Sequence, residues 1–177
     1  MKKKKQKKST GAGAKKKRKN GRDKGNRGER AVAKLFSTWW GADFARTPMS
    51  GGFRNQKFRQ DWNAEGDLVT PDTDFPFSVE CKWHEDWTLD QLITASDTTE
   101  IWQWWGQTLN QTEREKISLL VFKRNHMPWY YMVRSVWDED IPGRKFRICD
   151  PHGRSVTVGL LSDLMKTEKD EWLRKSR

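Results

Sequence analysis

An acidic and a basic side chain stand two positions apart in the segment FSVECKW, residues 77–83. Its first, third and fifth residues are apolar, which predicts a strand with one apolar face, because successive strand side chains point to opposite faces. Glu80 and Lys82 then share the other face, where a core-facing strand would favour an apolar residue. The pair is a candidate for chemistry, although a surface strand also often places a lysine two residues after a glutamate.

A second carboxylate precedes this strand. Asp67 is the second residue of the segment GDLVT, residues 66–70, and a short turn rich in Pro and Asp separates this segment from residues 77–83. Consecutive strands joined by a short turn are usually neighbours, so we expect antiparallel pairing that places Asp67 opposite Glu80. Two carboxylates in one pocket suit Mg²⁺, and the carbonyl of Cys81 is a further candidate ligand.

This pocket has the parts that phosphodiester hydrolysis requires. A bound Mg²⁺ lowers the pKa of a water molecule and neutralises the charge that develops on the phosphate. Lys82, placed beside that water, can orient it or stabilise the developing charge. We therefore predict that Asp67, Glu80 and Lys82 act together in cleaving a phosphodiester bond.

A third carboxylate, Glu29, lies in a segment with helical spacing. It precedes Val32 by three residues and Phe36 by seven, so it falls on the apolar face of a helix that is expected to end at Gly41. A carboxylate that points toward a core needs a partner or a cation. In the first turn of a helix it can instead simply interact with the helix dipole.

The remaining pattern predicts the elements that position these side chains. The helix from residue 26 precedes a short strand at 43–48, a long polar loop with glycines, and two strands at 66–70 and 77–83. A mainly helical segment at 89–109 leads to two further strands at 117–123 and 129–133. A hairpin at 145–158, with a type I turn at 150–153, and a final helix complete the chain. A loop of that length inside a compact domain is usually functional or disordered. The order predicts an α/β domain.

The length of 177 residues suits one domain with a sizeable core. The net charge of +11 belongs to the N-terminus, because residues 1–22 carry 12 of the 35 Lys and Arg residues and no acid. We expect a disordered basic tail at 1–24 and one domain at 25–177, with a core at 25–135 and an appendage at 136–177. The tail is expected to be an arm that neutralises phosphates, and a solvated charge run or localisation signal is the alternative.

Other classes of protein fit the sequence poorly. Two cysteines, Cys81 and Cys149, are too few for a disulfide framework or a zinc cluster, and the three histidines show no metal-ligand spacing. No segment has the length and apolarity of a membrane span. We therefore expect a cytoplasmic protein with no membrane association and no organic cofactor.

Four segments together resemble a known family. GNRGERAVAKLF, ARTPMSGG, GDLV and VECK are similar to the PD-(D/E)xK nuclease superfamily, and most closely to the archaeal-type Holliday junction resolvases and their phage-encoded relatives. The resemblance covers residues 25–82 and extends to about residue 133. It implies a restriction-endonuclease-like αβββαβ core with a mixed central sheet flanked by helices, to which the C-terminal hairpin and helix are added.

The resemblance also implies a site. Its metal ligands fall on Glu29, Asp67 and Glu80, with Lys82 as the catalytic lysine. Helices of relatives often place a glutamine near the active site, and Gln107 is the better match of the two glutamines spaced by four; a solvated helix face is the alternative. The chain departs from the family where Gly66 replaces the proline of the motif and where a long insertion precedes it.

The resemblance and the basic loop together predict a DNA-binding surface. Arg46 and Ser50 match the basic and serine positions near the scissile phosphate. The full set of predicted DNA-binding residues is Arg30, Arg46, Ser50, Arg54, Lys57 and Arg59. Most of the 11 tryptophans are expected in the core or an interface. Exposed ones such as Trp62, Trp83 or Trp87 could stack on an unpaired base.

We predict from these observations a Mg²⁺-dependent DNA endonuclease, with Mn²⁺ as a substitute metal, that cuts branched DNA such as Holliday junctions. A four-way junction has two equivalent strands to cut, so a homodimer is expected. One alternative is a nuclease of the same superfamily that acts on linear duplex DNA in restriction or repair. Another is a nucleic-acid-binding accessory protein that keeps the fold without catalysis.

Overall fold

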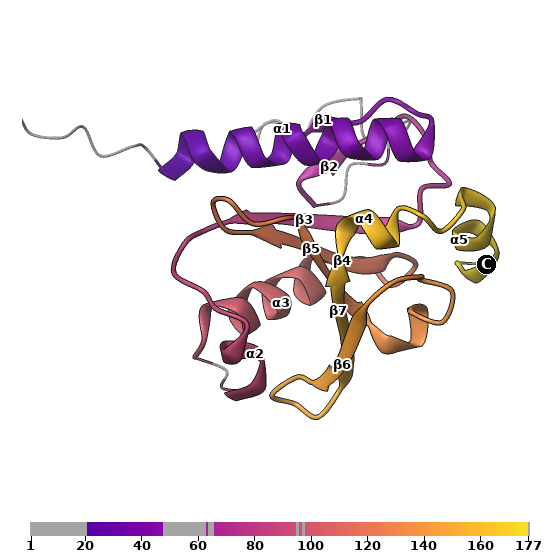
Figure 1. Cartoon of the computed structure of the whole chain (residues 1–177). Coiled ribbons are helices and arrows are strands. Elements are labelled where there is room, and N and C mark those ends of the chain that lie inside the picture. Colours follow the sequence, from indigo (N-terminus) through magenta and orange to yellow (C-terminus); the bar gives the residue numbers. More distant parts are fainter. Residues whose placement is uncertain (1–20, 48–62, 64–65, 95, 97, 177) are drawn as a thin grey trace, which may run out of the picture.

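The computed structural model describes residues 21–47, 63, 66–94, 96 and 98–176. A long helix and a small two-stranded sheet lie on one side of a five-stranded sheet, and two further helices cover its other side (Figure 1). The predicted α/β class, with a mixed sheet flanked by helices, is confirmed. Within these ranges, no helix combines the length and apolarity that a bilayer crossing needs.

Helix α1, Gly21–Trp40, forms because apolar residues recur every fourth position. Val32, Phe36 and Trp40 are all buried against the sheet. The helix ends where expected, at Gly41, whose φ of 73° suits glycine and whose N–H donates to the Ser37 carbonyl. It begins earlier than expected, so residues 21–24 are helical, whereas residues 1–20 of the expected tail lie outside the described ranges.

The central sheet contains five strands in the order β3-β4-β5-β7-β6. Their bounds are β3 Phe77–Trp83, β4 Ile117–Lys123, β5 Tyr130–Arg134, β6 Lys145–Cys149 and β7 Ser155–Leu160. β3 and β4 are parallel and every other neighbouring pair is antiparallel, which makes the sheet mixed. A parallel pair needs a crossover, and α2 (Asp90–Thr94) and α3 (Glu100–Gln111) supply it. The helical segment expected at 89–109 is thus two helices.

Both faces of β3 are covered. Phe77, Val79 and Cys81 pack in the cluster beneath α1, as the alternation predicts. The opposite face meets α3, where Trp102 and Trp105 belong to the second buried cluster. Because helices cover both sides of a sheet that contains a parallel pair, the side with Glu80 is also withdrawn from water.

The C-terminal segment completes the sheet and the core. The hairpin of β6 and β7 adds its strands beside β5, and the Gly153 N–H donates to the Asp150 carbonyl at 2.9 Å, as in the predicted type I turn. A 3₁₀ turn at Ser135–Trp137 precedes the hairpin, and helices α4 (Leu161–Leu164) and α5 (Lys169–Lys175) follow it. Trp172 is fully buried, with its ring 4.8 Å from that of Phe77. The segment after residue 136 therefore contributes buried side chains to the core, among them Ile141, Leu161 and Trp172.

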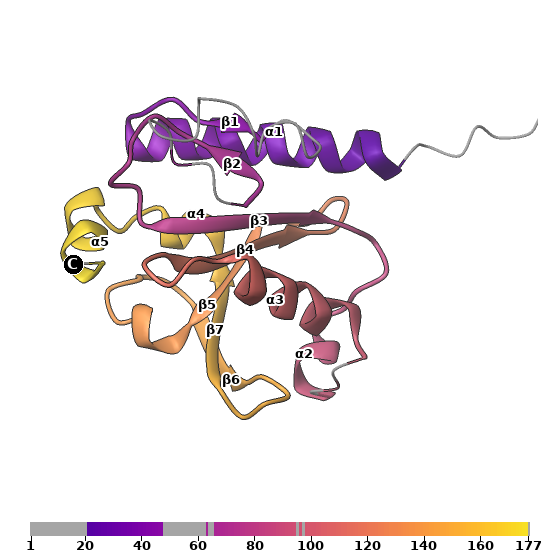
Figure 2. The same cartoon turned by 180° about the vertical axis from the view of Figure 1, so that it is seen from behind.

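The pairing expected for residues 66–70 is wrong. β2, Leu68–Val69, pairs antiparallel with β1, Ala45–Arg46, in a separate two-stranded sheet. Within residues 66–70, Gly66 forms the β-bridge to β3, in the parallel sense and opposite Val79. Figure 2 shows this small sheet between α1 and β3. The chain therefore reaches the edge of β3 by a short bridge and then turns away.

Candidate active site

Gly66 allows this close approach to β3. Its φ is 73°, and a Cβ at this position would lie 2.3 Å from the Val79 carbonyl oxygen. Proline, whose ring holds φ near −65°, could not adopt this conformation. The replacement of the family's proline by glycine is thus a requirement of the local geometry in this chain.

Asp67 is held against β3 by two hydrogen bonds. Its N–H donates to the Val79 carbonyl at 2.7 Å, and its Oδ2 accepts the Cys81 N–H at 2.8 Å. Among the described strands β3 is at the edge of its sheet, so these backbone groups are available to Asp67. The Asp67 carboxylate is therefore fixed beside the backbone of Cys81, which is the residue between Glu80 and Lys82.

Glu80 is buried on the α3 side of the same strand, with 4% of its surface exposed. Its Oε1 accepts a hydrogen bond from the Lys82 ammonium, and a second one from the Gln107 Nε2 at 3.0 Å. Gln107 projects from α3, whereas the amide of Gln103 donates to the Thr98 carbonyl at 3.4 Å. Of the two glutamines considered from the sequence, the structure brings Gln107 to the site.

Glu29 approaches from α1 and forms an ion pair with Arg46 of β1. The Arg46 Nε lies 2.8 Å from the Glu29 Oε2, and both side chains are largely buried, with 15% of Arg46 and 17% of Glu29 exposed. The contact is an ion pair by distance only, because the Arg46 Nε–H has no partner in hydrogen-bond geometry within the described part of the chain. Of the two expectations for Glu29, the inward-facing carboxylate with a partner is the one observed.

The three carboxylates influence one another electrostatically. Burial, and then the negative charge of Glu80, raise the pKa of Asp67 to about 7, against the opposing effect of the Cys81 N–H. Burial also raises the pKa of Glu29, although the Arg46 charge partly offsets it. The charge of Glu80 acts in the same direction as burial on the pKa of Glu29. Negative charge is therefore in excess in a partly buried space.

The donor set fits a hard divalent cation. Carboxylate oxygens are the ligands that Mg²⁺ prefers, and the Cys81 carbonyl faces the same strand edge as the Cys81 N–H that binds Asp67. Burial raises the pKa of the Cys81 thiol, whose side chain packs in the core beneath α1, so the sulfur is not a candidate. Protein groups engage all three carboxylates, and in the described ranges no three acidic, Cys or His side chains are grouped closely enough to hold a metal ion.

The predicted DNA-binding residues divide into two groups. Arg30 and Arg46 line a cavity between α1 and β1. Ser50, Arg54, Lys57 and Arg59 lie outside the described residues, as does Trp62. The structure therefore assigns two of the six to a common surface.

The tryptophans beside β3 also differ from one another. Trp87 is 1% exposed and packs on Phe122, so base stacking by Trp87 is excluded. Trp83 is partly exposed, and the ammonium groups of Lys24 and Lys123 lie 5.3 and 4.9 Å from its ring centroid. These cations were not identified from the sequence, because the contacts join α1 and β4 to β3.

Acidic side chains from α1 and from the approach to β2 thus interact electrostatically with Glu80 and Lys82 of β3, an arrangement consistent with a nuclease of the PD-(D/E)xK class. Residues 20–173 match the family described as "Phage putative PDDEXK endonuclease", and the chain belongs to this family. It is also similar to Protein D14 of Escherichia phage T5, with 23% identity over 145 residues that cover 78% of this chain and 88% of the relative. No solved structure matches the chain.

Proposed function

We propose that this nuclease is a Mg²⁺-dependent DNA endonuclease that cuts branched DNA, with Holliday junctions as its substrates. The observation that carries the catalytic part is the attachment of Asp67 to the edge of β3 beside Glu80. This attachment concentrates negative charge next to the Lys82 ammonium, which is the combination that metal-assisted phosphodiester cleavage uses.

Each residue has a distinct role in the proposal. Glu29, Asp67 and Glu80, with the Cys81 carbonyl, would hold the Mg²⁺, and Mn²⁺ is expected to substitute. The metal would supply Lewis acidity and lower the pKa of the attacking water. Lys82 would orient the attacking water or stabilise the negative charge that develops on the phosphate. Gln107 positions the Glu80 carboxylate through its hydrogen bond.

The preference for branched DNA is supported by sequence, through the similarity of residues 25–82 to the Holliday junction resolvases. Because a four-way junction presents two equivalent strands, the proposal includes a homodimer with one site in each subunit. The basic residues before α1 would add phosphate contacts that do not depend on sequence.

The catalytic proposal is tested by substituting two carboxylates. Asp67→Asn and Glu80→Gln are each expected to abolish cleavage of a synthetic four-way junction while binding remains measurable, because neutral amides are poor Mg²⁺ ligands. Asp43→Asn and Glu113→Gln are the matched controls, since neither residue is buried and neither belongs to the site. Full cleavage by either site variant would exclude the proposed metal site.

The substrate part needs a separate experiment. The wild-type protein is incubated with Mg²⁺ and with junction, flap, nicked and linear DNA of equal length. Faster cleavage of the junction supports the proposal, and equal or faster cleavage of the linear duplex assigns the protein to restriction or repair. Absence of both cleavage and Mg²⁺ binding by calorimetry would indicate a nucleic-acid-binding protein without catalysis.

A further inference from the structure

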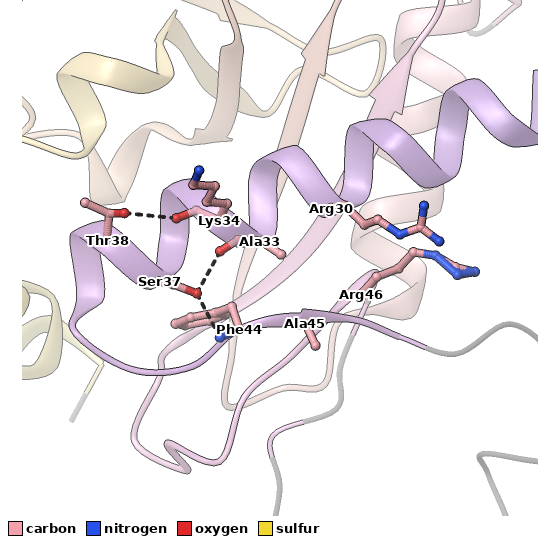
Figure 3. Close-up of a pocket in the computed structure, with 8 residues that line it drawn as sticks. All are labelled: Arg30, Ala33, Lys34, Ser37, Thr38, Phe44, Ala45 and Arg46. Atoms are coloured by element: carbon pink, nitrogen blue, oxygen red, sulfur yellow. Dashed lines mark hydrogen bonds between the residues drawn. The ribbon is translucent and has the colours of Figure 1, made fainter.

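A cavity of about 630 Å³ lies between α1 and β1, beside the Glu29 end of the site. Figure 3 shows its lining, in which Arg30 and Lys34 project from α1 one turn apart and Arg46 projects from β1. Among the described residues, three cationic side chains and no acidic ones line this space. The cavity therefore has the charge of a site for an anion.

The fold builds the walls of this cavity. The Ser37 hydroxyl donates to the Ala33 carbonyl at 3.1 Å and accepts the Phe44 N–H at 3.0 Å. These bonds tie the chain before β1 to the last turns of α1, as Figure 3 shows. Phe44 is further fixed by its ring contact with Phe75 at 4.8 Å between centroids. The opening is thus defined by packed groups, and two of the three cations, Arg30 and Lys34, project from α1.

The two cations of α1 are spaced by about one helical turn. Arg30 and Lys34 are four residues apart on the exposed face of α1, so their positions differ by about 6 Å along the helix axis. Thr38 continues the row by another turn and also lines the cavity. A DNA strand presents a similar row, because it carries one negative charge at every nucleotide.

We infer that this cavity is a groove that binds the backbone of one DNA strand. The strand would leave the carboxylate site along α1, and its phosphates would contact Arg30 and Lys34. The inference rests on the proposed nuclease function and specifies the course of its substrate. Arg46 marks the end of the groove nearest the site, because it also contacts Glu29. Contacts to phosphates position a strand without reading its sequence, so the groove is expected to serve any base sequence.

The inference is tested by removing Lys34, which has no part in the metal site. Lys34→Ala is compared with wild type in binding a fluorescent four-way junction and a duplex in EDTA, where cleavage cannot occur. Binding is expected to weaken several-fold on both, and the slope of log affinity against log salt is expected to flatten by about one unit. Arg114→Ala, which removes an exposed cation between α3 and β4, is the control that should retain wild-type affinity.

A second measurement locates the contact on the DNA. Single phosphates are replaced in turn by neutral methylphosphonates on a strand around the cleavage position. When the phosphate that Lys34 contacts is neutralised, the affinity of the wild-type protein should fall. The affinity of Lys34→Ala should not change at this position, because its contact with the phosphate is already absent.

Wild-type affinity and salt slope in Lys34→Ala, or equal losses by both proteins at every phosphate, would overturn the groove as a strand-binding surface. Either result would leave cleavage by wild type intact, so the nuclease proposal would stand. Failure of wild type itself to cleave any DNA would instead refute the proposed function.

Discussion

Single residues place the acidic groups of this nuclease. Gly66 brings the backbone within bridging distance of β3, Asp67 then hydrogen-bonds to the strand edge, and Gln107 reaches Glu80 from α3. The site thus depends on the backbone conformation of Gly66 and on the hydrogen bonds of Asp67 and Gln107. Each can be removed separately, and each has a counterpart elsewhere in the chain that serves as a control.

Gly66→Ala is expected to destabilise the fold by about 1–3 kcal/mol, because alanine is strained at positive φ and its Cβ would overlap the Val79 carbonyl. The free energy of unfolding by urea measures the effect. Gly153→Ala separates the two causes, since Gly153 also has a positive φ, of 77°, but a Cβ there would meet no described atom within 4 Å. If both variants lost the same free energy of unfolding, the overlap of the added Cβ with β3 would add nothing to the cost of positive φ.

Gln107→Ala is expected to slow cleavage by about 10–100-fold with little change in DNA affinity, because Gln107 orients a metal-binding carboxylate. Single-turnover rates and anisotropy measure the two quantities. Gln103→Ala on the same helix is the control, since its amide bonds to the Thr98 carbonyl. If both variants cleave at the wild-type rate, Gln107 belongs to a solvated helix face, as the sequence alone allowed.

At the scale of elements, a buried acid connects the 3₁₀ turn to the hairpin. Asp138 has a fully buried side chain that accepts hydrogen bonds from Arg147 Nε at 2.7 Å and from the Thr157 hydroxyl. Burial alone would raise its pKa, but these bonds and the charge of Arg147 outweigh it and hold the pKa below the usual value. The ionised carboxylate is therefore favoured in the folded state.

This depressed pKa predicts how stability responds to acid. A carboxyl group whose pKa is lower when folded stabilises the protein above its unfolded pKa of about 4, and this contribution is lost as pH falls through the folded pKa. Asp138→Asn should be less stable than wild type by about 1–3 kcal/mol near pH 7. Urea unfolding at a series of pH values should show this difference narrowing below about pH 4. A difference that stays constant with pH would contradict the assignment.

At the scale of the molecule, charge is divided between a near-neutral domain and a basic N-terminus. Residues 1–20 carry 11 Lys and Arg residues and no acid, and α1 begins immediately after them. Deleting residues 1–20 should weaken DNA binding and flatten its salt dependence, because fewer counterions are released. Titrations of junction DNA at several salt concentrations provide the test. An unchanged slope would remove the N-terminus from the DNA interface.

The assembly is also a property of the whole molecule. A homodimer predicts a mass in sedimentation equilibrium of about twice the 20.9 kDa of one chain. It also predicts that a junction bound by a mixture of wild type and Asp67→Asn is cut on one strand by the mixed dimer. A mass of one chain, both free and on junction DNA, would exclude paired cleavage by a dimer.

The sequence by itself determined the nature and order of most elements, the class of nuclease and the residues Asp67, Glu80 and Lys82 as candidates. The segments predicted as strands at 77–83 and 117–123 coincide with β3 and β4. Alternating apolar residues and short apolar runs indicate which faces of a strand are buried, so such strands can be predicted from sequence. The type I turn before β7 could also be predicted from the sequence, because Asp, Pro and Gly favour the backbone conformations of such a turn.

Tertiary structure decided how those elements meet. It placed Asp67 on β3 through a parallel bridge in place of an antiparallel hairpin, covered Glu80 with α3, and buried Trp87. It also opened the cationic groove between α1 and β1. The physical reason is that periodicity along a chain reveals which side of an element avoids water, whereas its covering partner is selected by packing among segments distant in sequence.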